Sequence, residues 1–86
     1  MKYIKFGSSN CPNCVKLDAL IDMHNLTNGL EVVYENIDNT SSLEYAKSRG
    51  IRAIPVIIAF DAEGNEVKRL NGLKPLPTVK AFFESS

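Results

Sequence analysis

The sequence predicts an α/β fold in which a four-stranded mixed sheet is flanked by helices on both faces. Three observations support this prediction. Segments of strand and helix character follow one another in the order β-α-β-α-β-β-α along the 86 residues. The first strand, helix and strand form a crossover unit, so their two strands are expected to be parallel. The last two strands are separated by a short turn, so they form a hairpin that makes the sheet mixed.

The first strand and the first helix are predicted from alternation and from a proline. Residues 2–6 alternate between two faces, as strand residues do. The helix is expected to begin near Cys11, because Pro12 suits a first helical position. Asn28 and Gly29 are a plausible C-terminal stop. The helix is expected to be largely buried, because apolar residues cover most of its circumference: Val15, Leu17, Ala19, Leu20, Ile21, Met23 and Leu26.

The middle of the chain is predicted to contain a strand and a short helix. Residues 30–37 have the composition of a second strand. Ser41 and Glu44 have the spacing of a capping box, which opens a helix that continues through Arg49. Gly50 is expected to end that helix.

The last part of the chain is predicted to be a hairpin followed by a helix. Residues 55–60 are continuously apolar and rich in β-branched side chains, which predicts a strand covered on both faces. Residues 61–65 form the turn, and residues 66–70 form a more polar strand suited to a sheet edge. Pro75 and Pro77 introduce the last helix. Its buried face is expected from Leu76, Val79, Phe82 and Phe83.

Composition and charge narrow the function classes. Apolar residues make up 44% and charged residues 23%, which is typical of one globular domain spanning residues 1–86. Ten basic residues balance ten acidic ones, which argues against a nucleic-acid or anionic-membrane binder. The longest apolar run, residues 54–60, is too short to span a bilayer. The first six residues lack the apolar stretch of a signal peptide, so we expect a cytoplasmic protein. We also expect it to be a monomer.

The informative motif is Cys11-Pro12-Asn13-Cys14. On a first helical turn this spacing puts the two thiols side by side, near enough for a disulfide. The free N–H groups and the dipole of the helix N-terminus favour a thiolate there. Cys11 at the tip is therefore expected to be the nucleophile, and Cys14, one turn deeper, the resolving thiol. A zinc site is the alternative, but it normally needs four ligands and only His24 remains, so it would require a dimer.

A Cys-x-x-Cys pair followed by a helix in a βαβ pattern is typical of thioredoxin-like proteins, and the sequence resembles the thioredoxin and glutaredoxin family. Residues 49–56 resemble the stretch that leads into the cis-proline strand of thioredoxins, and Asn71-Gly72 follows the edge strand as it does in the family. The resemblance implies a minimal thioredoxin fold and a cis Ile54–Pro55 bond. It also implies a substrate-binding surface made of Pro12, Asn13, Ile54, Pro55 and Gly72. Gly72 has a second interpretation as a plain turn glycine.

The sequence also departs from the family pattern. Asn10 replaces the usual Trp, and Pro12 takes the first intervening position, as in glutaredoxins. Residues 53–55 and 71–74 do not reproduce the glutathione-binding patterns of glutaredoxins. Lys5 stands where thioredoxins carry a buried Asp. It is interpreted either as a cation beneath the cysteines that favours a thiolate or as a strand lysine that extends to the surface.

These features predict a dithiol–disulfide oxidoreductase that reduces disulfides in protein substrates. The resemblance implies a thioredoxin-type reductase as electron donor. No bound cofactor is expected, because the redox centre is the disulfide of Cys11 and Cys14 itself. Two alternatives stay open: a glutaredoxin that reduces glutathione mixed disulfides, and a non-enzymatic module that binds a partner or carries a metal.

Overall fold

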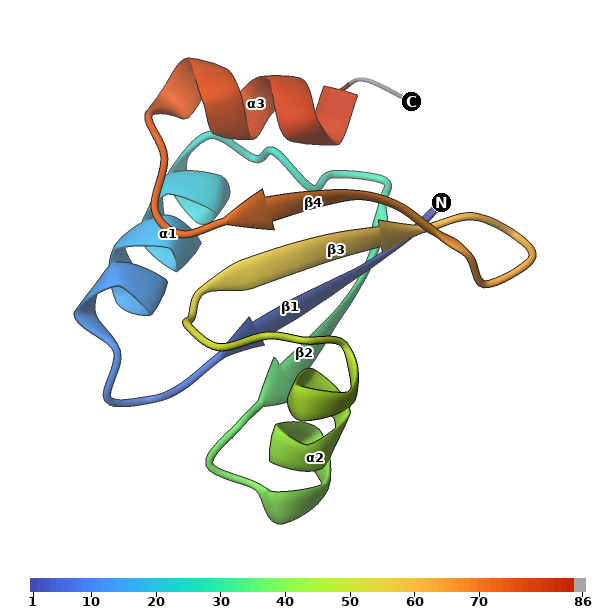
Figure 1. Ribbon diagram of the computed structural model, residues 1–86. Coiled ribbons are helices and arrows are strands. Elements are labelled where there is room, and N and C mark those ends of the chain that lie inside the picture. The colour runs from blue at the N-terminus through green and yellow to red at the C-terminus, as the bar shows by residue number, and fades with distance from the viewer. Residues whose placement is uncertain (85–86) are drawn as a thin grey trace.

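The computed structural model describes residues 1–84, and its elements follow the predicted order (Figure 1). They are β1 (Lys2–Gly7), α1 (Pro12–Met23), β2 (Glu31–Asn36), α2 (Thr40–Ser48), β3 (Val56–Phe60), β4 (Glu66–Asn71) and α3 (Leu76–Glu84). None of the helices within residues 1–84 is long and apolar enough to cross a membrane.

The strands form one mixed sheet in the order β2-β1-β3-β4. β1 runs parallel to β2 and antiparallel to β3, and β3 and β4 form an antiparallel hairpin. In this register Lys5 lies opposite Tyr34 on one side and opposite Ile57 on the other. The predicted parallel crossover, the hairpin and the place of β4 at the sheet edge are all confirmed.

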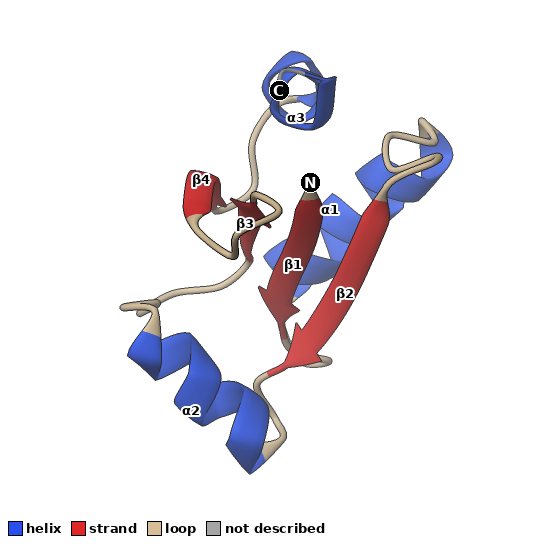
Figure 2. Ribbon diagram, turned by 90° about the vertical axis from the view of Figure 1, so that its right-hand side faces the viewer, coloured by secondary structure: helices blue, strands red, loops and turns tan. Residues whose placement is uncertain are grey.

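Helices cover both faces of the sheet, so the core has two layers. Figure 2 shows α2 on one side of the strands, with α1 and α3 on the other. The α1 and α3 layer contains Tyr3, Leu17, Ile21, Ile57, Ala59, Leu70, Val79, Phe82 and Phe83. The α2 layer contains Ile4, Phe6, Ala46, Val56, Ile58 and Phe60. Every residue of β3 is buried, as its continuous apolar run predicts.

The expectation that α1 is largely buried is wrong. The buried residues of this helix are Cys14, Leu17 and Ile21. Val15 and Met23 are 58% and 79% exposed. The reason is geometric: α1 contacts the sheet along one narrow stripe, and α3 occupies the rest of the same face.

The end of α1 also differs from the prediction. The helix ends at Met23 and not at Asn28 and Gly29. His24 is the C-cap, and Asn25 then adopts a left-handed conformation with φ of 52°. Asn tolerates that conformation better than most residues do, so the chain can leave the helix there and cross to β2.

The capping box predicted at the start of α2 is also wrong. The helix begins at Thr40 with Asn39 as its N-cap, and no side chain caps it. Ser41 therefore lies inside the first turn, where its hydroxyl cannot form the reciprocal bonds of a capping box with Glu44. The prediction that Gly50 ends this helix is confirmed. Gly50 directly follows the C-cap, Arg49, and has φ of 73°.

Candidate active site

The two cysteines lie at the start of α1, just after the loop that follows β1. Cys11 is the N-cap of α1 and Pro12 is its first residue, as the sequence predicts. Cys11 and Cys14 form a disulfide with their Cα atoms 5.1 Å apart. The Cys14 N–H also donates a hydrogen bond to Cys11 Sγ over 3.1 Å. A free helical N–H group therefore points at the sulfur of Cys11, which is the contact that favours a thiolate in the reduced state.

The two sulfurs differ in their access to a partner molecule. Cys14 is 4% exposed and lies on the face of α1 that is turned toward Gly7 of β1. Cys11 is half-buried, and the Pro12 and Asn13 that follow it are exposed. A second disulfide approaching the pair from outside therefore reaches Cys11 first, whereas Cys14 can react only within the protein.

The segment before β3 forms the other wall of the site. The Ile54–Pro55 bond is cis, as the resemblance implies. The carbonyl oxygen of Ile54 lies 4.0 Å from Cys11 Sγ. Among residues 1–84, no backbone–backbone hydrogen bond involves either polar group of Ile54. The Pro55 carbonyl, in contrast, accepts a 2.8 Å hydrogen bond from the Gly72 N–H, which ties β3 to the end of β4.

A cavity of about 410 Å³ runs beside this segment. Its lining includes Ile54, Pro55 and Gly72, three residues of the expected substrate-binding surface. Gly72 has φ of 81°, a conformation that favours glycine, and no heavy atom lies within 4 Å of a Cβ built on it. Gly72 therefore makes a turn and lines an open cavity, while its part in substrate binding stays a prediction.

The floor of the site is formed by a glycine and a tyrosine. A Cβ built on Gly7 would lie 3.4 Å from Cys14 Sγ, 3.3 Å from the Tyr34 ring and 3.5 Å from the Tyr34 hydroxyl oxygen. Both groups thus approach the same point on β1. The phenol of Tyr34 is a neighbour of the buried sulfur, although the side chain is 48% exposed.

Lys5 lies two residues before Gly7 and therefore on the same face of β1. Its side chain does not extend to the surface. Its side chain is 15% exposed and forms an ion pair with the carboxylate of Asp18 on α1. The ammonium also lies 5.0 Å from the centroid of the Tyr34 ring. Burial lowers the pKa of Lys5, and the nearby charge of Asp22 partly offsets that effect. The surface-lysine interpretation is therefore wrong, while an effect of Lys5 on the Cys11 thiolate stays a prediction.

The loop between β1 and α1 is held by Asp38. Its carboxylate accepts hydrogen bonds from the Ser8 hydroxyl at 2.8 Å and from the Ser9 N–H at 3.3 Å. The Ser8 hydrogen bond is the main cause of a lowered pKa for Asp38. This contact joins the residues before Cys11 to the end of β2, so it fixes the approach of the chain to the disulfide.

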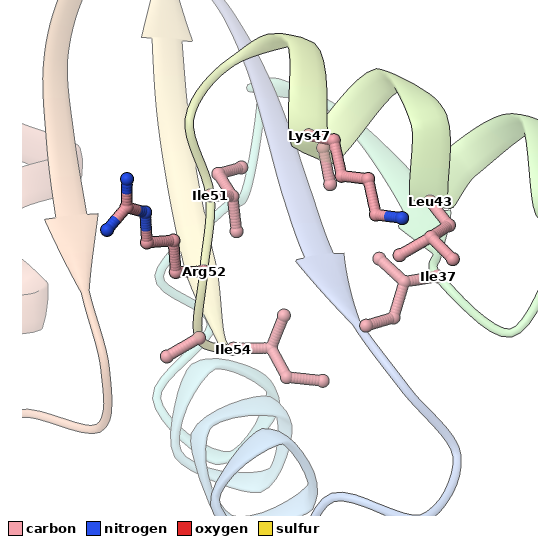
Figure 3. Close-up of a pocket in the computed structure, with 8 residues that line it drawn as sticks. Ile37, Leu43, Lys47, Ile51, Arg52 and Ile54 are labelled. Carbon is pink, nitrogen blue, oxygen red and sulfur yellow. The ribbon is translucent and has the colours of Figure 1, made fainter.

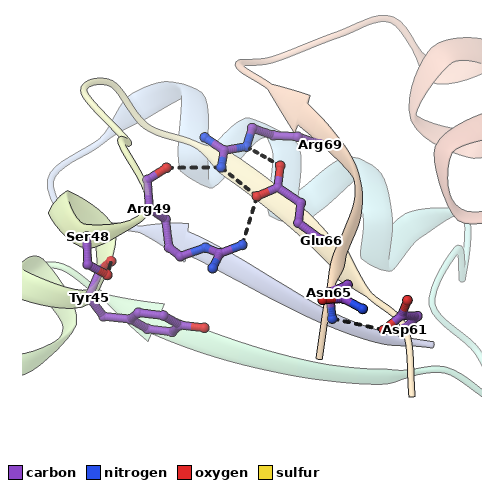
Figure 4. A network of polar contacts seen from close by, with 7 residues as sticks. All are labelled: Tyr45, Ser48, Arg49, Asp61, Asn65, Glu66 and Arg69. Atoms are coloured by element: carbon purple, nitrogen blue, oxygen red, sulfur yellow. Dashed lines mark hydrogen bonds and ion pairs between the residues drawn. The ribbon is translucent and has the colours of Figure 1, made fainter. Parts of the chain in front are cut away.

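A second polar network lies on the far side of the cavity. Figure 4 shows Glu66 between two arginines, Arg49 at the end of α2 and Arg69 on β4. Their ion pairs with Glu66 are 3.0 and 2.8 Å long. Arg69 also donates to the Arg49 carbonyl at 3.0 Å and lines the cavity beside Gly72. The network therefore connects α2 to the edge strand beside this cavity.

Sequence reasoning missed Asp18, Tyr34 and Asp38 as neighbours of the site. A signal existed for Asp18, which follows Cys14 by one helical turn and so lies on the same face of α1. Tyr34 could be found only once the register with β1 was known. Within residues 1–84, no three His, Cys, Asp or Glu side chains are grouped as metal ligands would be.

The fold and this site define a class of protein. A helix-tip Cys-x-x-Cys pair on a four-stranded mixed sheet with three helices is the arrangement of the thioredoxin fold. The chain matches a thioredoxin-like domain family over residues 2–85, and it belongs to that family. The fold, the family and the cysteines at disulfide distance together support thiol–disulfide oxidoreductase chemistry in general.

Similar proteins agree with this assignment. The SPbeta prophage-derived thioredoxin-like protein YosR of Bacillus subtilis is 31% identical over 75 residues, which is 87% of this chain and 86% of YosR. A mutant thioredoxin of Halobacterium salinarum superposes with a TM-score of 0.75 at 24% identity, over 96% of this chain and 71% of that one. Thioredoxin 1 of Thermosipho africanus gives 0.74 at 19% identity, over 98% and 91% of the two chains. At these identities the two structures bear on the fold alone.

Proposed function

We propose that the protein reduces disulfide bonds in other proteins, with Cys11 as the attacking thiolate and Cys14 as the resolving thiol. The observation that carries this proposal is the difference between the two sulfurs. Cys11 caps α1 and accepts a backbone N–H, whereas Cys14 is 4% exposed. A nucleophile that meets a partner and a second thiol shielded from it are what dithiol exchange requires.

The reaction balances within the pair and its substrate. In the reduced protein, the Cys11 thiolate attacks one sulfur of a target disulfide, which breaks that bond and releases one target thiolate. Cys14 then loses its proton and attacks Cys11 Sγ, which breaks the mixed disulfide and releases the second target thiol. The Cys11–Cys14 disulfide forms, so two electrons pass from the pair to the substrate. The Cys14 proton ends on the second target thiol, and the first target thiolate takes its proton from water.

We assign substrate docking to the surface around Cys11. The backbone groups of Ile54 form no backbone–backbone hydrogen bond within residues 1–84, and the carbonyl oxygen lies 4.0 Å from Cys11 Sγ. They suit an extended segment that adds as a short strand. Pro12 and Asn13 are exposed on one side of the sulfur. Pro55 and Gly72 line the cavity on the other side, where the glycine leaves room for a backbone to approach.

We propose that a thioredoxin-type reductase returns the oxidised pair to the dithiol. No bound cofactor takes part in this scheme, because the cysteines themselves carry the electrons. The proposal places the protein in the cytoplasm as a monomer, where a reducing environment keeps thiols reduced. The choice of a reductase over glutathione as electron donor is supported by residues 53–55 and 71–74, which lack the patterns that hold glutathione in glutaredoxins.

The test is a trapping experiment with single-cysteine variants. Cys14→Ser, reduced and mixed with a protein disulfide, is expected to stall as a mixed disulfide through Cys11. Cys11→Ser is expected to form no adduct and to reduce nothing. Intact-mass spectrometry measures the adduct, and Ser41→Ala, at an exposed position on α2, is the control. Normal multiple turnover by Cys14→Ser would show that the dithiol mechanism is wrong.

One feature favours a glutaredoxin as second candidate. Pro12 occupies the first position between the cysteines, as it does in glutaredoxins. A glutaredoxin would reduce glutathione mixed disulfides with glutathione as donor. Assays coupled to glutathione and to a thioredoxin-type reductase, run with the same substrate, separate the two functions. Saturable turnover with glutathione alone would move the protein to this second class.

A further inference from the structure

A second, apolar cavity of about 380 Å³ lies on the α2 side of the segment before β3. Figure 3 shows Ile37, Leu43, Ile51 and Ile54 around it, with α2 above and the ends of the strands below. Its side chains are aliphatic apart from Lys47 and Arg52. The cavity is therefore suited to an apolar side chain from a partner.

The cavity lining contains two cations. Lys47 and Arg52 are exposed, and no acidic side chain within residues 1–84 lines the cavity. Among residues 1–84, neither takes part in an ion pair or a side-chain hydrogen bond. In Figure 3 the Lys47 ammonium lies above Leu43, and the Arg52 guanidinium points to the other side of the segment. A partner lying across this segment thus meets a positive charge on either side.

The cavity adjoins the candidate active site at Ile54. This residue lines both cavities, and its carbonyl oxygen lies 4.0 Å from Cys11 Sγ. In an extended segment, residues two positions apart lie on one face and about 6–7 Å from each other. A substrate whose cysteine is at Cys11 can therefore place a residue a few positions away into the aliphatic cavity.

We propose that this surface selects protein substrates in which an apolar residue beside an Asp or Glu lies within a few residues of the target cysteine. The inference rests on the proposed function and narrows its substrate class. The apolar side chain fills the cavity, and the carboxylate pairs with Lys47 or Arg52. Glutathione offers carboxylates but no apolar side chain, so the aliphatic lining favours a protein segment over it.

The test uses single-turnover reduction of two disulfide-bonded peptides that differ only in Leu-Glu or Leu-Gln beside the cysteine. Chemically reduced protein is mixed with each peptide, so no donor enzyme is needed. For every variant, the rate with each peptide is divided by the rate with bis(2-hydroxyethyl) disulfide, a small neutral compound, so that differences in thiol reactivity cancel. Lys47→Gln and Arg52→Gln remove the charges, and Lys80→Gln on α3 is the matched control, because it removes an exposed charge on the opposite face of the sheet.

We expect the wild type to reduce the Glu peptide faster than the Gln peptide, by about two- to five-fold per charge pair. Lys47→Gln and Arg52→Gln each lose part of this preference, and Lys80→Gln keeps it. Lys47→Glu should reverse the preference toward a Leu-Lys peptide.

Equal rates for the two peptides with the wild type would overturn the inference and leave the proposed function standing. Equal losses with oxidised glutathione and the Glu peptide would assign the cations to glutathione and also overturn it. If neither the peptides nor the small disulfide are reduced, the proposed function fails as well.

Discussion

Lys5 of β1 and Asp18 of α1 form an ion pair across the interface between the sheet and the helix that carries the cysteines. The lysine is 15% exposed and the aspartate 40%, so water screens the pair only in part. Asp18 follows Cys14 by one helical turn, and this contact fixes the helix to the strand close to the buried sulfur. Tyr34, stacked on the Lys5 ammonium at 5.0 Å, adds a third member.

Asp18→Asn is expected to lower the free energy of unfolding by about 1 kcal/mol, because it removes the ion-pair partner of the largely buried Lys5 ammonium. Urea denaturation of the oxidised protein measures the change. The double variant with Lys5→Met should be less destabilised than the sum of the two single variants, which identifies the pair as the cause. Glu44→Gln, an exposed carboxylate on α2, is the control. Additive effects would contradict the pairing.

The stability contributed by Lys5 should depend on pH with a defined sign. Burial lowers the pKa of Lys5 below its usual 10.5, so the folded protein releases this proton at a lower pH than the unfolded chain. The unfolded state then binds more protons in that window, and stability rises with pH. The wild type should therefore gain stability relative to Lys5→Met as pH rises from neutral toward 10.5. Urea titrations of both oxidised proteins test this, and a falling difference would contradict it.

Gly7→Val is expected to destabilise the protein by about 1–3 kcal/mol through crowding in the core. Its side chain would meet Cys14 Sγ and the Tyr34 ring, which already lie 3.4 and 3.3 Å from the position of a Cβ. Gly7→Ala should be milder, since the half-exposed Tyr34 can shift. Thermal or urea unfolding gives the stability, and adding Tyr34→Ala should recover part of the loss. No recovery would place the clash at Cys14 alone.

The two cysteines of the reduced protein should alkylate in a fixed order. Cys11 is half-buried at the tip of α1, whereas Cys14, on the buried face of the first turn, is 4% exposed. Iodoacetamide at neutral pH should therefore label Cys11 first, because both access and the helix N-terminus favour it. Peptide mapping after short labelling times measures both sites. Equal labelling of a folded sample would contradict the assignment of roles to the two thiols.

The sheet could be predicted from the sequence because the residue pattern of each strand favours a strand over a helix. Residues 56–60 are apolar throughout, and such a run fits a strand buried on both faces. α1 was harder, because apolar residues occur on nearly all its sides. Only the stripe of Cys14, Leu17 and Ile21 is buried, and Val15 and Met23 lie off that stripe and are exposed. Helix periodicity contains no information about a neighbouring helix far along the chain.

The candidate site divides in the same way. The cysteine pair is local, since four consecutive residues place both sulfurs on one helical turn. The partners of Lys5 are not local, because Asp18 reaches it only after the helix has packed on the sheet. The positions of Lys47 and Arg52 around an aliphatic cavity likewise depend on how α2 leads into the segment before β3. Such contacts arise from tertiary packing, which a single sequence does not specify.

The central place of β1 in the sheet has a consequence for the kinetics of folding. Its two neighbours are distant in sequence: Lys2 lies opposite Glu31 on one side and opposite Phe60 on the other. The second pairing closes a loop of nearly sixty residues, and long closures are entropically expensive and slow. While the chain is being synthesised, β1 therefore keeps an open edge until β3 has emerged. Hydrogen-exchange pulse labelling should find the amides on the β3 side of β1 protected later than those on the β2 side.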